Sequence, residues 1–195
     1  MLADYKIKVR FDFTFFAVIA LLVFIDTGGT ALLSLIACVL HEGGHLLAMA
    51  LCGVVPEKIT FYGGGIAISK RMDSVSAAKR LIILSAGCSV NAVLALSTAL
   101  LPQNSTMQIF SAVNLLICCF NALPIGYFDG AEILRIIFES IFRPRTAEII
   151  KKTIGIIMCV LIVTALFIYC VICEQDVSIS LGFVVLYLIL AQFIG

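Results

Sequence analysis

The stretch His41-Glu42-Gly43-Gly44-His45 decides how this chain is organised, and it lies inside a long apolar run. Residues four apart lie on the same face of a helix, so a helix here would point both imidazoles in one direction, with the carboxylate beside them. Two neutral imidazoles at this spacing are ligands for zinc, and the carboxylate can take a proton from a water that the metal activates. These are the only two histidines in the chain. The pattern predicts a catalytic metal site; the alternative is a coincidental His pair at a helix interface.

The composition around this stretch indicates a membrane protein. Of the 195 residues, 62% are hydrophobic and 13% are charged. A soluble domain of this length has too small a volume to bury so much apolar surface. Uncharged runs of about 20 residues, the length of a helix that crosses a bilayer, recur along the chain. We expect an integral, multi-pass protein in the lipid bilayer, and the net charge of +1 gives no indication of nucleic-acid binding.

The expected fold is all-α and polytopic, with about six transmembrane helices and a short membrane-associated β-hairpin after the second. The apolar runs place these helices at about 13–25, 30–51, 81–101, 107–128, 153–173 and 177–195. We expect a single domain, 1–195. Its core of three helices covers about 30–135, and its accessory helices are 13–26, 153–173 and 177–195.

The hairpin is expected within Ile59–Ser69, because β-prone residues flank the triple glycine Gly63, Gly64 and Gly65. An exposed strand edge could hold the backbone of a substrate by strand addition. A helix hides its peptide bonds, so a helical segment bound in this way would first have to be unwound. A plain connecting loop is the alternative for this segment.

The basic residues predict the orientation in the membrane. With six helices, all 13 Lys and Arg residues fall on the side that also holds both termini. The positive-inside rule therefore places both termini in the cytoplasm. The His pair then lies in the cytoplasmic half of its helix.

A catalytic zinc site normally has three protein ligands, so one more is needed. Asp129, at the end of the fourth expected helix, is the main candidate, because ionisable residues at membrane depth are costly and usually functional. Pro124 and Gly126 would unwind that helix and let the carboxylate turn towards the His pair. Alternatively, Asp129 only caps a helix at 130–142. Glu132 is a weaker substitute, better explained as a solvated charge in the first turn of that helix.

Two separated motifs resemble those of the site-2 proteases, which are intramembrane zinc metalloproteases. The motifs are His41-Glu42-x-x-His45 and Asn121-x-x-Pro124-x-x-x-x-Asp129-Gly130. The resemblance implies Zn²⁺ as the cofactor, His41, His45 and Asp129 as its ligands, and Glu42 as the general base.

The same resemblance implies partners and a location. It implies a transmembrane or membrane-tethered protein substrate, and membrane proteins as possible regulators. The compact layout looks most like the branch of the stage IV sporulation protease, which implies a bacterial cell membrane and a role in sporulation or signalling.

Several positions depart from the pattern of the site-2 proteases. Gly43 stands where a bulky residue is common, Ala131 where a second glycine is common, and Cys88 where proline is common. Asn91 resembles a residue that positions substrate, and an interhelical hydrogen bond is its alternative role. Asn121 either orients the site or satisfies carbonyls freed at Pro124.

Two other functions remain open from the residues alone. The same His, Glu and Asp cluster could form the pathway of a transporter or channel for metal ions or protons. However, the paired inverted halves that are typical of transporters are not found in the sequence. A binding protein that keeps the fold without cutting is the third possibility. The eight cysteines are expected to be packing residues.

Overall fold

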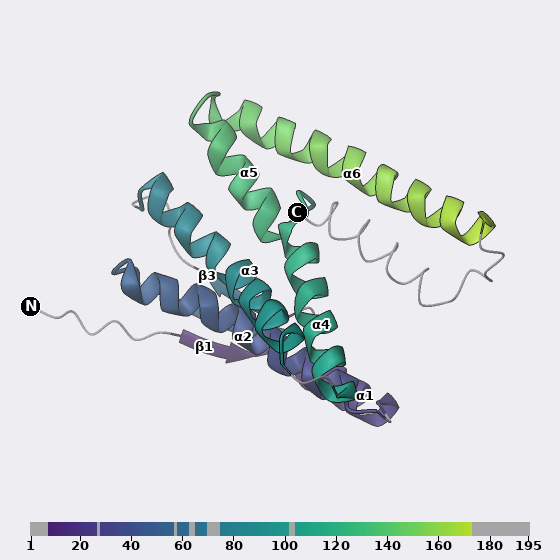
Figure 1. Cartoon of the computed structure of the whole chain (residues 1–195). Helices are drawn as coiled ribbons and strands as arrows, with labels where there is room; N and C mark the ends of the chain where they lie inside the picture. The colour runs from purple at the N-terminus through teal and green to yellow at the C-terminus, as the bar shows by residue number, and fades with distance from the viewer. Residues whose placement is uncertain are drawn as a thin grey trace, which may run out of the picture. The chain divides into compact units, whose positions relative to one another are not determined.

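The computed structural model describes residues 8–26, 28–56, 58–62, 65–69, 75–101 and 104–172. The chain divides into two compact units, Met1–Cys119 and Phe120–Gly195. The elements in chain order are β1 (Lys8–Phe11), α1 (Phe13–Ile25), α2 (Thr30–Leu51), β2 (Lys58–Tyr62), β3 (Gly65–Ser69), α3 (Ala77–Ala99), α4 (Ser105–Ala122), α5 (Asp129–Glu139) and α6 (Pro144–Ile172) (Figure 1).

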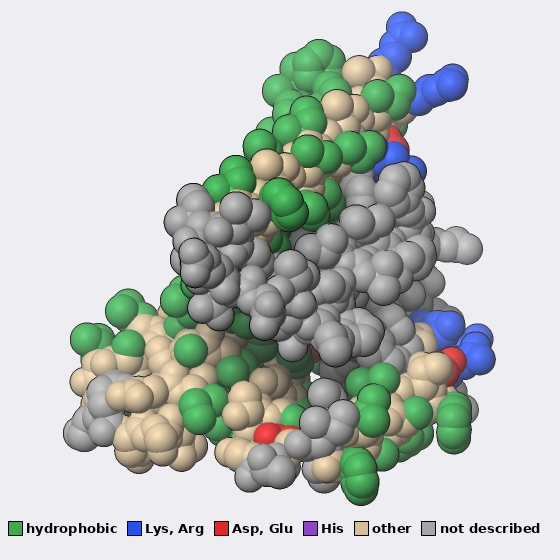
Figure 2. Space-filling model, turned by 90° about the vertical axis from the view of Figure 1, so that its right-hand side faces the viewer, with side chains coloured by type: hydrophobic (Ala, Val, Ile, Leu, Met, Phe, Trp, Pro, Cys, Tyr) green, Lys and Arg blue, Asp and Glu red, His purple; other side chains and the backbone are tan. Residues whose placement is uncertain are grey.

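Four of the described helices are long and apolar enough to cross a membrane: α2, α3, α4 and α6. On the face drawn in Figure 2, hydrophobic side chains are spread along the described helices, whereas Lys and Arg lie in a few groups. The expectation of six transmembrane helices is not confirmed. With 13 residues, α1 is shorter than the roughly 20 that a span needs. The sixth expected helix, 177–195, lies outside the described residues.

The hairpin after α2 is confirmed, and it belongs to a larger sheet than the sequence predicted. β2 and β3 pair antiparallel, and β1 adds to β2 in parallel, which gives the order β1-β2-β3. The label all-α is therefore too narrow. Phe11 on β1 stacks on Phe61 of β2 with ring centroids 4.5 Å apart.

The first unit is held together where α2 packs on α3 (Figure 1). The buried residues of α2 recur every three or four positions and include both histidines. Small residues allow close packing here, since a Cβ on Gly44 would come within 2.9 Å of the Ala86 carbonyl oxygen. Met49 and Ile83 form part of the apolar cluster at one end of this contact.

Hydrogen bonds made by polar side chains join α4 to α3. The Ser111 hydroxyl donates to the Ala95 carbonyl oxygen at 2.9 Å. One turn further along α4, Asn114 accepts a hydrogen bond from Asn91 at 2.8 Å. The spacing of these contacts shows that α4 runs antiparallel to α3.

In the second unit, helical structure is interrupted between α4 and α5, in the region where Pro124 predicted a helix break. Gly126 has a φ of 55°, which favours glycine. Gly130 lies so close to the Ala122 carbonyl oxygen that a Cβ there could not be accommodated. Ile125 is fully buried and packs with Cys159 of α6. The fourth expected helix, 107–128, is therefore a shorter helix followed by a tight turn, and α5 begins directly at Asp129.

Candidate metal centre

His41 and His45 lie on successive turns of α2 and are both buried, with 4% and 8% of their surface exposed. They belong to the stripe of α2 that packs on α3, so the i, i+4 spacing brings the rings together as the sequence predicted. Their ring centroids lie 4.8 Å apart and the ring planes are almost perpendicular, at 84°.

Each imidazole has its Nδ1 atom held by an acceptor oxygen. His45 Nδ1 lies 2.7 Å from the carbonyl oxygen of Ile83, and a carbonyl can only accept. His41 Nδ1 lies 2.6 Å from Oδ1 of Asn91. The amide of Asn91 is oriented by its Nδ2 atom, which donates to the Ala37 carbonyl oxygen at 3.2 Å. In a neutral imidazole held this way the proton lies on Nδ1, so that Nε2 presents its lone pair.

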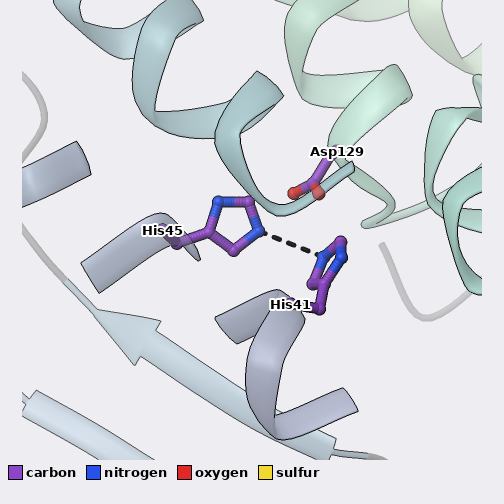
Figure 3. A group of neighbouring side chains, drawn as sticks. All are labelled: His41, His45 and Asp129. Atoms are coloured by element: carbon purple, nitrogen blue, oxygen red, sulfur yellow. Dashed lines mark hydrogen bonds between the residues drawn. The ribbon is translucent and has the colours of Figure 1, made fainter. Parts of the chain in front are cut away.

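The two Nε2 atoms face one another at 3.1 Å (Figure 3). Without a metal, an N–H of one ring can donate to the other nitrogen at this distance, and a divalent cation bound between the two nitrogens would take the place of that proton. Two nitrogens bound to one zinc ion, each at about 2.1 Å in tetrahedral geometry, would lie about 3.4 Å apart. The neutral nitrogen donors and their separation fit a divalent metal such as zinc.

Gly87 of α3 borders both Nε2 atoms. A Cβ at this position would lie 2.5 Å from Nε2 of His45 and 2.7 Å from Nε2 of His41. No real Cβ approaches polar atoms so closely, so only glycine leaves this space open. The packing of α3 on α2 therefore keeps the metal-facing side of the histidine pair clear.

The other predicted site residues are distributed over both units. Glu42 lies on α2 next to His41 and is half-buried. Asn91 is fully buried on α3. Asn121 lies in the last turn of α4, and Gly65 is the first residue of β3. Gly63 and Gly64 lie outside the described residues. The roles predicted for these residues stay predictions.

Asp129, which Figure 3 also draws, lies in the second unit as the first residue of α5. The N-cap of α5 is Phe128, so Asp129 lies one position inside the helix instead of at the cap position that the alternative expected. Glu132, the weaker substitute, is instead engaged in ion pairs, at 2.7 Å from Arg135 and 3.4 Å from Lys151. Its expected position in the first turn of the helix is confirmed.

These ion pairs set the ionisation of Glu132. Burial raises the pKa of the Glu132 carboxyl, but the hydrogen bond from Arg135 and the charges of Arg135 and Lys151 lower it by more. The net pKa is therefore below the ordinary value, and the carboxylate stays charged.

Sequence reasoning did not single out Asn114 or the Ile83 carbonyl as parts of the site, and it assigned no contact with the histidines to Gly87. The spacing of Ile83, Gly87 and Asn91 on α3 was the available signal, because residues four apart share one helix face. The spacing on α3 alone does not show which face of α2 these residues contact. Only the packed helices identify these neighbours.

Two comparisons with known proteins found similarities. The model of a family described as Peptidase family M50 matches residues 101–165, which include Asn121 and Asp129. The fold is similar to that of the site-2 protease from Methanocaldococcus jannaschii, with a TM-score of 0.65 and 21% sequence identity. That similarity covers 96% of this chain and 90% of the other. None of the curated proteins matches the sequence.

Proposed function

We propose that this protein is an intramembrane zinc metalloprotease of the site-2 type. His41, His45 and Asp129, a group of the residue types that could hold a metal ion, are its zinc ligands in this proposal. Glu42 is its general base.

The observation that carries the proposal is the pair of Nε2 atoms, 3.1 Å apart on a helix apolar enough to cross a membrane. Two imidazole nitrogens at this separation match the ligands of one divalent cation, and ionisable residues at membrane depth are usually functional. The matched family model and the solved structure with the same fold are both named as proteases, which supports peptide hydrolysis as the reaction.

The residues of the chain would divide the chemistry between them. Zinc, when bound, polarises a carbonyl and lowers the pKa of a water ligand. Glu42 would take the proton of the attacking water and pass it to the amine that leaves. Asn121 would orient the site, and Asn91 would lie near the substrate. The Gly63–Gly65 loop would lie beside the peptide.

The substrate proposed is a transmembrane or membrane-tethered polypeptide. Among the described strands, β3 lies at an edge of the sheet, where an extended peptide could pair with it. We further propose a multi-pass protein in a bacterial cell membrane with both termini in the cytoplasm, as the basic residues predict. A role in sporulation, with membrane proteins as regulators, rests on the resemblance alone.

A transporter or channel for metal ions or protons is not favoured, because both matches are to proteases. The transporter alternative also predicts movement of ions across the bilayer, which a protease does not require.

The proposal is tested by co-expressing the chain with candidate single-span membrane proteins. We expect a cytoplasmic substrate fragment that disappears with Glu42→Gln while that variant still binds zinc. Glu139→Gln, which changes a carboxylate in an ion pair of α5, is the matched control and should still cut. Cleavage by Glu42→Gln at the wild-type rate, or cleavage that persists after zinc is removed, would overturn the assignment.

A further inference from the structure

A chain of buried hydrogen bonds leads from one imidazole of the candidate metal centre across two further helices. His41 Nδ1 donates to Asn91 Oδ1 at 2.6 Å, and Asn91 Nδ2 donates to Asn114 Oδ1 at 2.8 Å. Asn114 Nδ2 in turn donates to the Phe110 carbonyl oxygen at 2.8 Å. Both asparagines have 0% of their surface exposed.

The direction of every hydrogen bond in this chain is fixed by its ends. The Ala37 and Phe110 carbonyl oxygens can only accept, so they identify the Nδ2 atoms of Asn91 and Asn114 as donors. Asn91 therefore presents Oδ1, and no N–H group, to His41. If the amide of Asn91 were turned the other way, its NH₂ group and its oxygen would each face the wrong kind of partner in a buried place. Each lost partner would cost about 1–3 kcal/mol.

We propose that Asn91 and Asn114 are positioning residues that hold His41 as a metal ligand. Asn91 keeps the proton of His41 on Nδ1 and fixes the ring, so that the Nε2 lone pair faces the metal. Asn114 holds the amide of Asn91 in the orientation that this requires. The inference deepens the proposed function and rests on it, because it assigns to Asn91 a role in ligand orientation besides any contact with substrate.

Comparison with His45 shows why His41 needs a second residue to fix the orientation of its Nδ1 partner. The Nδ1 partner of His45 is a backbone carbonyl oxygen of α3, which cannot reverse its role. The Nδ1 partner of His41 is a side-chain amide, which can rotate and present a donor instead. A second amide that locks the first removes this freedom. Outer partners of this kind typically change metal affinity by about 10–100-fold when they are removed.

The test uses the full-length protein in detergent micelles, with zinc affinity measured by competition against a chelator. Asn91→Leu is expected to lower the affinity about 10–100-fold. Asn91→Asp keeps an acceptor for His41 but loses the donor to Ala37 and Asn114, so it should recover only part of this loss. Asn114→Leu should give an affinity between those of the wild type and Asn91→Leu. Ser111→Ala removes a different hydrogen bond between α3 and α4, one that is not part of the series from His41 to Phe110. This variant should bind zinc like the wild type.

A second readout reports the imidazole itself. Selective ¹⁵N labelling of histidine gives a spectrum of only two rings, because the chain has two histidines. Asn91→Leu and Asn114→Leu should shift the Nδ1–H signal of His41 in the zinc-free protein and leave that of His45 unchanged. Ser111→Ala should shift neither signal.

The inference is overturned if Asn114→Leu leaves both the zinc affinity and the His41 signal unchanged, even where Asn91→Leu fails to fold. It is equally overturned if Ser111→Ala lowers zinc affinity as much as the asparagine variants, since general packing would then explain the effect. The histidine spectrum requires neither zinc nor cleavage. If the His41 signal shifts in the asparagine variants as expected but the wild-type protein cuts no substrate, the protease function is therefore refuted and the inference stands.

Discussion

Gly87 and His45 lie on neighbouring helices so close together that a Cβ on residue 87 would come within 2.5 Å of the Nε2 atom of His45. The space that a metal needs beside the histidine pair is thus left open by the absence of a single methyl group. This relationship gives the first prediction.

Gly87→Ala should reduce the zinc content of the purified protein to a small fraction of the wild-type value, because the methyl group would collide with the nitrogens that bind the metal. Gly43→Ala is the matched control, since a Cβ at position 43 meets nothing within 4 Å. That control should keep its zinc and gain helix stability by about 0.5–1 kcal/mol. Normal zinc content in Gly87→Ala would show that the metal does not bind beside α3.

Asp129→Asn should lower zinc affinity by on the order of tenfold or more, because an amide is a poorer ligand than a carboxylate for zinc. Competition with a chelator measures the affinity. Asp26→Asn serves as the control, since Asp26 accepts hydrogen bonds from the backbone N–H groups of Thr30 and Ala31 at the start of α2. Unchanged affinity in Asp129→Asn would remove this residue from the ligand set.

The stability of the second unit should decrease at acid pH through Glu132. Its folded-state pKa lies below the ordinary value of 4.5, because Arg135 and Lys151 outweigh the effect of burial. The stability that the charged form adds is therefore complete above about pH 4.5 and is lost as the pH falls through the lower, folded-state pKa. Thermal unfolding in detergent between pH 7 and pH 3 measures this loss.

Glu132→Gln should flatten that dependence on pH, whereas the more exposed Glu148→Gln should change it less. An identical acid transition in Glu132→Gln and the wild type would show that other carboxyl groups cause it.

Phe61→Ala should release β1 from the sheet. Phe61 stacks on Phe11 and meets Phe15 edge-on at 5.4 Å, and each aromatic pair contributes about 0.5–1.5 kcal/mol beyond the burial of area. Hydrogen exchange of the amides of residues 8–11 should become faster. Phe24→Ala, at a side chain that is 87% exposed, should leave that exchange unchanged. Equal exchange in Phe61→Ala and the wild type would show that backbone pairing alone holds β1.

Much of the candidate site follows from local sequence. The i, i+4 spacing places His41 and His45 on one face of a helix wherever that helix is packed. Pro124 and Gly126 likewise predicted the break that makes Asp129 the first residue of α5. These features depend on residues a few positions apart, whose geometry is set by the backbone.

The sequence by itself therefore determined four of the six predicted apolar helices, the histidine pair and the hairpin, because their periodicity and turn residues act within one element. The tertiary structure decided which groups hold the two imidazoles and that β1 joins β2. Asn91 lies 50 residues from His41, and Phe61 lies 50 residues from Phe11. Contacts at such separations depend on which helix faces and strand edges meet, and this is fixed only when the apolar surfaces of several elements are buried together.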